Sequence, residues 1–78
     1  MTLEQIALPD AVRLQADGIL IDIGQAEGVL ELARLGGIVE GFALGLSSAQ
    51  ALPGMVVDAL ESALTRAINA RMAALRQA

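Results

Sequence analysis

The stretch PDAVRLQADGILIDIGQAEGVLELARLG, residues 9–36, decides the fold. Its apolar residues recur at alternating steps of four and three, the a/d spacing of a helix that packs along one side. Pro9 suits the first turn of such a helix, and Asp10 complements the positive end of its dipole. The spacing therefore predicts one long helix over residues 9–36. The residues of this first stripe are Val12, Ala16, Ile19, Ile23, Ala26, Leu30 and Ala33.

A second set of residues recurs every seven positions and lies away from the first stripe on a helical wheel. A helix with two apolar stripes needs two partners, of which one is the second helix of its own chain and the other is another chain. We therefore take Leu14, Ile21, Leu35 and Phe42 as candidate contact residues. Phe42 is the only aromatic residue and has the area of a binding hot spot, although it would equally fill the turn of a hairpin. The second stripe consists of Leu14, Ile21, Gly28, Leu35 and Phe42.

The segment GILIDIG, residues 18–24, gives a competing interpretation as a β-strand. It is rich in β-branched residues and bounded by glycines. Each glycine also lowers helix propensity by about 1 kcal/mol relative to alanine. The helix remains the preferred interpretation because the sequence contains no second good strand to pair with this one.

Glycine, serine and proline divide the rest of the chain. Gly36–Gly37 predicts the end of the first helix, and residues 37–52 a Gly/Ser-rich joint with room for a short third helix. Within this joint, Ser47 precedes Gln50 by three positions, the spacing of a capping box. Pro53 cannot lie deep within a helix, so a last amphipathic helix is expected over residues 53–77.

These elements predict an all-α fold, an antiparallel helical hairpin in a single domain over residues 1–78 with a lead over residues 1–8. A chain of this length buries little apolar surface, and small domains compensate with disulfides, metals or oligomerisation. The sequence has no Cys for a disulfide and no His for a metal site. We therefore expect two copies to assemble as a homodimeric bundle.

The longest apolar stretch, residues 35–57, raises the alternative of a membrane span. It has the necessary length, but it contains Glu40 and Pro53, and the chain has no Trp or Tyr to anchor a helix at the membrane interface. The pairs Gly24–Gly28 and Gly41–Gly45 match the small-xxx-small spacing of membrane helix pairs. We favour the simpler interpretation that these glycines permit a bend or a close approach.

Composition excludes several classes of function. The net charge of −4 argues against binding to nucleic acid through phosphate neutralisation. Without His, Cys, Lys or Tyr the chain lacks the usual nucleophile and base pairs, so we expect no enzyme, no metal site and no cofactor. The first residues lack the pattern of a secretion signal, which predicts a cytoplasmic protein. Abundant Ala, with Arg as the only cation, favours a bacterial or phage source.

Arg71 is the last candidate contact residue, because it falls within the apolar face of the final helix. A long Arg near a helix end commonly extends to water, whereas the alternative is an acid on another helix, Asp22 or Glu40. The function expected from these features is that of a small acidic helical module that regulates or inhibits a larger protein by binding it. The alternatives are a membrane-active, holin-like protein that uses residues 35–57, and an antitoxin or chaperone-like subunit that neutralises its partner.

Overall fold

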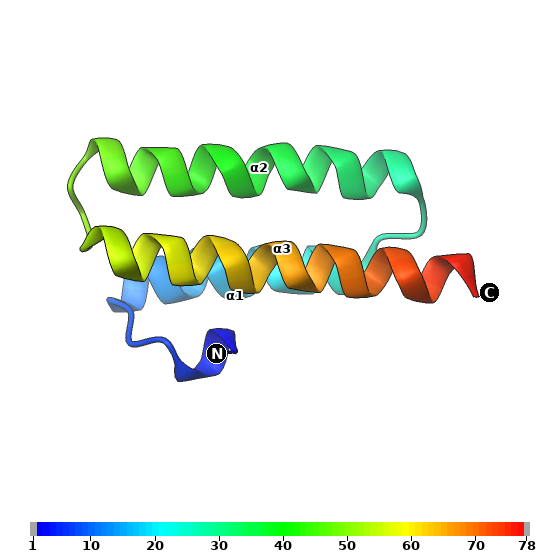
Figure 1. Ribbon diagram of the computed structural model, residues 1–78, viewed down its shortest axis with the longest axis horizontal. Helices are drawn as coiled ribbons and strands as arrows, with labels where there is room; N and C mark the ends of the chain where they lie inside the picture. Colours follow the sequence, from blue (N-terminus) through cyan, green and yellow to red (C-terminus); the bar gives the residue numbers. More distant parts are fainter. Residues whose placement is uncertain (1, 78) are drawn as a thin grey trace.

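A computed structural model describes residues 2–77 and is helical throughout its regular elements (Figure 1). Within these residues lie a short 3₁₀ turn, η1 (Leu3–Gln5), and three α-helices, α1 (Asp10–Gln25), α2 (Val29–Ser48) and α3 (Gly54–Arg76). The predicted all-α class is confirmed. The strand interpretation of residues 18–24 is wrong, since this segment lies inside α1.

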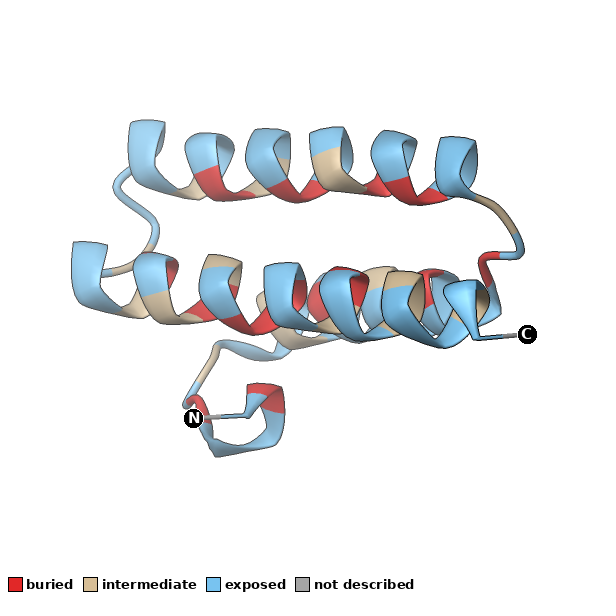
Figure 2. Ribbon diagram, turned by 45° about the vertical axis from the view of Figure 1, so that its right-hand side comes forward, coloured by how far each residue is buried: buried red, intermediate tan, exposed pale blue. Residues whose placement is uncertain are grey.

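Each helix runs antiparallel to the one before it (Figure 1), and α3 makes the most contacts with the other elements. It contacts α1, α2 and η1, and the described part of the chain measures 39 × 22 × 18 Å. Figure 2 shows that the buried positions of α2 lie along the side that faces α3. The core is entirely apolar in residues 2–77, and five large side chains at its centre are fully buried. These are Ile23, Leu32, Leu35, Leu60 and Leu64.

The first helix ends eleven residues earlier than the predicted boundary at residue 36, because the chain breaks at Ala26–Gly28. Ala26 and Gly28 have extended backbones, with ψ of 133° and 164°. The break changes which heptad positions face the core. Before it, the first stripe is inside, as at Ala16 and Ile23. After it, Leu30 of the same stripe is 87% exposed, while Leu32 is 1% exposed.

The predicted joint over residues 37–52 is also wrong in its first part, because Gly36 and Gly37 lie inside α2. Each glycine costs a helix about 1 kcal/mol relative to alanine. Burial of a Leu or Val side chain contributes about 1.5–3 kcal/mol, and the helix buries Leu32, Leu35 and Val39 around the two glycines. Tertiary burial therefore exceeds the local cost, and the helix continues to Ser48.

The apolar stretch over residues 35–57 is thus divided between two helices. α2 ends at Ser48, and α3 begins at Gly54, directly after Pro53 as the sequence predicts. In the part of the chain that the structure describes, no helix combines the length and apolar character needed to cross a membrane.

α2 ends in hydrogen bonds typical of a Schellman motif. The Gln50 N–H donates to the Ser47 carbonyl oxygen at 3.1 Å, and the Ala51 N–H donates to the Leu46 carbonyl oxygen at 3.0 Å. Gln50 itself has a φ of 52°, in the left-handed region where glycine is favoured. Ser47 and Gln50 therefore belong to the end of a helix, and the predicted capping box at the start of one is wrong.

Gln50→Gly should stabilise the protein. A side chain in the left-handed region costs about 1–2 kcal/mol, which is partly offset by the larger entropy of glycine in the unfolded chain. We expect the free energy of unfolding to rise by about 1 kcal/mol and the melting temperature by about 4–8 °C. Thermal denaturation followed by circular dichroism measures this change. Gln50→Ala keeps the strained backbone and is the control; a gain as large in this variant would contradict the explanation.

The predicted lead, of which residue 1 lies outside the described residues, is a packed segment of the fold. Leu3 and Ile6 are buried and belong to the core. The Arg13 guanidinium on α1 donates hydrogen bonds to the Leu3 carbonyl oxygen, at 2.9 Å, and to the Ile6 carbonyl oxygen. A cation on α1 thus holds the N-terminal segment against the helices.

Candidate interaction surfaces

The second stripe does not form one continuous surface. Leu14 and Ile21 are 75% and 58% exposed on the outer face of α1. Leu35 is 1% exposed, and Phe42 is half-buried and packs against the core. The break after Gln25 separates the two halves, so Leu35 and Phe42 contribute to packing within the chain, whereas Leu14 and Ile21 remain at the surface.

Arg71 connects α3 to the segment between α1 and α2. Its Nε donates a hydrogen bond to the Ala26 carbonyl oxygen at 2.9 Å. Ala26 is the C-cap of α1 and is 1% exposed, so its carbonyl lies at the negative end of the helix dipole and away from water. This hydrogen bond goes to the backbone, while Asp22 and Glu40, the acids considered from the sequence, are exposed.

The outer face of α2 is apolar and was missed as a surface by the sequence analysis. Leu30 and Leu44 are 87% and 68% exposed, and the positions between them are small and exposed. The steps of three and four from Leu30 onward place these residues on one face of the helix. The signal was present, because this face continues the first stripe beyond the break. Its members are Leu30, Ala33, Gly37, Gly41 and Leu44.

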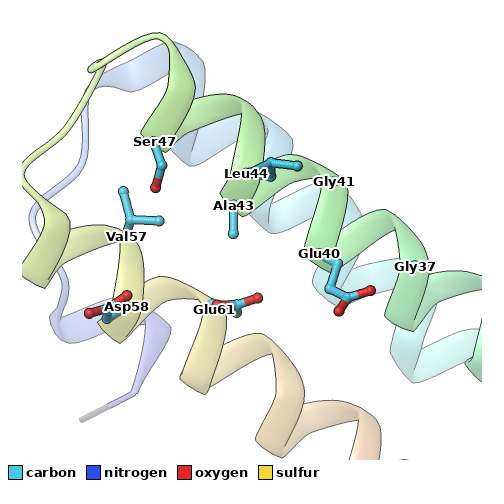
Figure 3. Close-up of a pocket in the computed structure, with 9 residues that line it drawn as sticks. All are labelled: Gly37, Glu40, Gly41, Ala43, Leu44, Ser47, Val57, Asp58 and Glu61. Atoms are coloured by element: carbon cyan, nitrogen blue, oxygen red, sulfur yellow. The ribbon is translucent and has the colours of Figure 1, made fainter.

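A groove of about 560 Å³ lies beside this face, between the C-terminal half of α2 and the first turns of α3 (Figure 3). Its volume falls within the roughly 300–1,000 Å³ of typical ligand sites. Ala43 from α2 and Val57 from α3 are buried, and both point into the space between the two helices (Figure 3). The lining residues are Gly37, Glu40, Gly41, Ala43, Leu44, Ser47, Val57, Asp58 and Glu61.

The rim of the groove is acidic on both sides. Figure 3 shows Glu40 on α2 and Asp58 and Glu61 on α3, and the lining contains no Lys or Arg. Glu40 and Asp58 are exposed, and Glu61 is half-buried. Over residues 2–77, no three carboxylates are grouped closely enough to hold a metal ion. The three acids are instead distributed along the groove, where each can meet a separate cation.

Glycine forms part of the α2 side of the groove. A Cβ added to Gly37 or Gly41 would meet nothing within 4 Å, so neither glycine is required by a contact within the chain. Because the two glycines have no side chains, nothing projects from α2 into the groove at these positions. The site could not be recognised from sequence alone, because Glu40 and Glu61 come from helices whose pairing only the fold establishes.

No protein-family model matches the chain, and neither a search of the curated proteins nor a search of the solved structures finds a significant match.

Proposed function

We propose that this protein is a small helical protein-binding module that regulates a larger protein by covering part of its surface. The observation that carries the proposal is a set of large apolar side chains outside a closed core. Leu14 on α1, Leu30 and Leu44 on α2, and Met55 on α3 are each at least 68% exposed. Of these, Leu30 and Leu44 share the outer face of α2 with Ala33, Gly37 and Gly41, all of them exposed. An apolar patch that gathers on one face of a helix is typical of a protein-binding surface.

The distribution of polar groups supports a binding role over catalysis. The buried residues among positions 2–77 are all apolar, so the carboxylates and hydroxyls lie toward the surface. Catalytic acids and bases are usually found where burial and neighbouring charges tune them. The groups present here are suited to pairing with charges on a partner.

A homodimer forms part of the same proposal, and we assign it to α1. Leu14 and Ile21 are seven residues apart and exposed on one face of the helix, so the same pair on a second copy would cover them. This face is separate from the groove, which is lined only by α2 and α3. A dimer formed through α1 therefore leaves the groove open.

The proposal is tested by native pull-down with the tagged protein in an extract of its source organism. We expect a defined protein to co-purify in a fixed ratio, and Leu30→Gln/Leu44→Gln to lose it while keeping its helical circular dichroism spectrum. Sedimentation equilibrium of the purified chain should give a dimer of twice its 8.0 kDa mass. The Leu14→Gln/Ile21→Gln variant should give the mass of one chain. If Leu30→Gln/Leu44→Gln binds the partner as well as the wild type does, the outer face of α2 is not the binding site. If the wild-type protein is a monomer, the proposed dimer is wrong.

A further inference from the structure

We infer that the groove between α2 and α3 binds one amphipathic helix of another protein, with apolar residues against Leu44 and the groove floor and Arg or Lys side chains against Glu40, Asp58 and Glu61. This inference rests on the proposed function, because it specifies the partner of a protein-binding module. It goes further by naming both the site and the chemistry of the occupant.

The shape of the groove fits a helix. From Gly37 to Ser47 it extends over ten helical steps of α2, or about 15 Å at 1.5 Å per residue, which matches about three turns of a docked helix. Because Gly37 and Gly41 lack side chains, a second helix can approach the backbone of α2 closely. The free space around both glycines leaves this approach unobstructed by the chain itself.

The apolar part of the groove gives the helix a surface to cover. Ala43 and Val57 form the floor, and Leu44 is 68% exposed at the edge. Leu30, 87% exposed, continues this surface toward the start of α2. Amphipathic helices bind such grooves through apolar residues spaced three and four positions apart.

The acidic residues around the groove favour a basic helix as its occupant. Glu40 lies on one side of the apolar floor, and Asp58 and Glu61 lie on the other, with no cation among the lining residues. A helix with Lys or Arg on both flanks of its apolar face would meet an acid on each side. A second copy of this chain is a poorer occupant, because it brings the same net charge of −4. Nucleic acid is excluded for the same electrostatic reason.

The test measures fluorescence anisotropy of a labelled 16-residue peptide with a Leu face flanked by Lys, titrated with the full-length protein. A matched peptide carries Glu in place of every Lys. We expect the Lys peptide to bind at least tenfold more tightly, and its affinity to fall as salt is raised because exposed charges are screened. Equal binding of the two peptides would overturn the charge argument.

Two variants locate the binding site. Gly41→Leu places a large side chain at the groove, at a position where an added Cβ meets nothing within 4 Å, and should weaken Lys-peptide binding at least tenfold. Its control, Gly45→Leu, adds the same side chain to an exposed position of α2 outside the groove and should bind as the wild type does. If Gly41→Leu also binds as the wild type does, the peptide does not occupy the groove and the inference is wrong.

Two further variants distinguish the effect of the acids at the groove on peptide binding from the effect of the net charge of the protein. Glu40→Gln/Asp58→Asn/Glu61→Gln should weaken Lys-peptide binding at least tenfold. The control neutralises three exposed acids away from the groove and should have a much smaller effect, although its net charge is the same. This control is Asp17→Asn/Asp22→Asn/Glu27→Gln. Equal losses in the two variants would show only non-specific attraction and would contradict the site.

The remaining outcomes are also informative. If the wild-type protein is a dimer and Gly41→Leu alone makes it a monomer, the groove is occupied by a second copy and the inference is overturned. If no Lys peptide binds at millimolar protein while the native pull-down still recovers a partner through α2, the inference fails and the proposed function survives. Absence of both peptide and partner would reject the two together.

Discussion

Leu35→Ala should lower the free energy of unfolding by about 3.5 kcal/mol, the middle of the range for a fully buried Leu replaced by Ala. Leu35 is 1% exposed and lies on the side of α2 that packs on α3. Its loss leaves a cavity at the centre of the core, and the melting temperature should fall by more than 10 °C. Urea denaturation at constant protein concentration gives the free energy directly.

Leu30→Ala is the matched control on the same helix. Leu30 is 87% exposed, and surface substitutions of this kind usually change stability by less than about 0.5 kcal/mol. An uninterrupted helix over residues 9–36 would keep Leu30 on the packed stripe and reverse the order of the two effects. Comparison of the free energies of unfolding of the two variants therefore tests, in solution, whether the helix breaks at Ala26–Gly28.

Arg71→Met should cost about 2 kcal/mol, although it retains a long side chain. The substitution removes the hydrogen bond from Nε to the Ala26 carbonyl oxygen and leaves a buried acceptor unpaired. Hydrogen bonds from charged donors contribute about 1.5–3 kcal/mol. We also expect faster amide hydrogen exchange at residues 26–29, because Arg71 fixes this segment to α3.

Asp22→Asn and Glu40→Gln distinguish this explanation from an ion pair. Both acids are exposed, and we expect each variant to melt within about 2 °C of the wild type. An Arg71 that extended only to water would make Arg71→Met neutral. If Asp22→Asn or Glu40→Gln were as destabilising as Arg71→Met, the acid would be the stabilising partner.

The sequence predicts best where one local signal acts alone. Pro9 and Pro53 immediately precede α1 and α3, and each fixes a helix start to within a residue. The amphipathic pattern of residues 53–77 corresponds closely to α3, which ends at Arg76. Such signals depend on neighbouring residues only, so they can be recognised in the sequence before the fold is known.

The break between α1 and α2 was missed because two apolar stripes overlap there. The first stripe passes through Ala26 to Leu30 without an error in spacing. After the break, Leu35 of the second stripe is buried together with Leu32, which belongs to neither stripe, while Leu30 of the first stripe is exposed. Which residues are buried depends on which of them pack against α3, so it is determined by tertiary contacts. The conspicuous Gly36–Gly37 pair was a misleading signal, because burial on both sides of it outweighs its low helix propensity.

The groove lies beyond what sequence patterns specify. Residues 40, 58 and 61 come together only after α2 and α3 pair in a fixed register. The exposed glycines looked like possible sites of close packing within the chain, and the space around them shows that no such contact exists. Their placement at the groove became visible only from the arrangement of the helices.

The large share of helix contacts made by α3 has a consequence for how the chain acquires its structure during synthesis. α3 is the last of the three helices along the chain and contacts both of the others as well as η1. While a ribosome is still making α3, the apolar sides of α1 and α2 lack their main partner. Stable folding therefore waits until all of α3 has been made, and until then the apolar sides of α1 and α2 stay exposed and prone to aggregation.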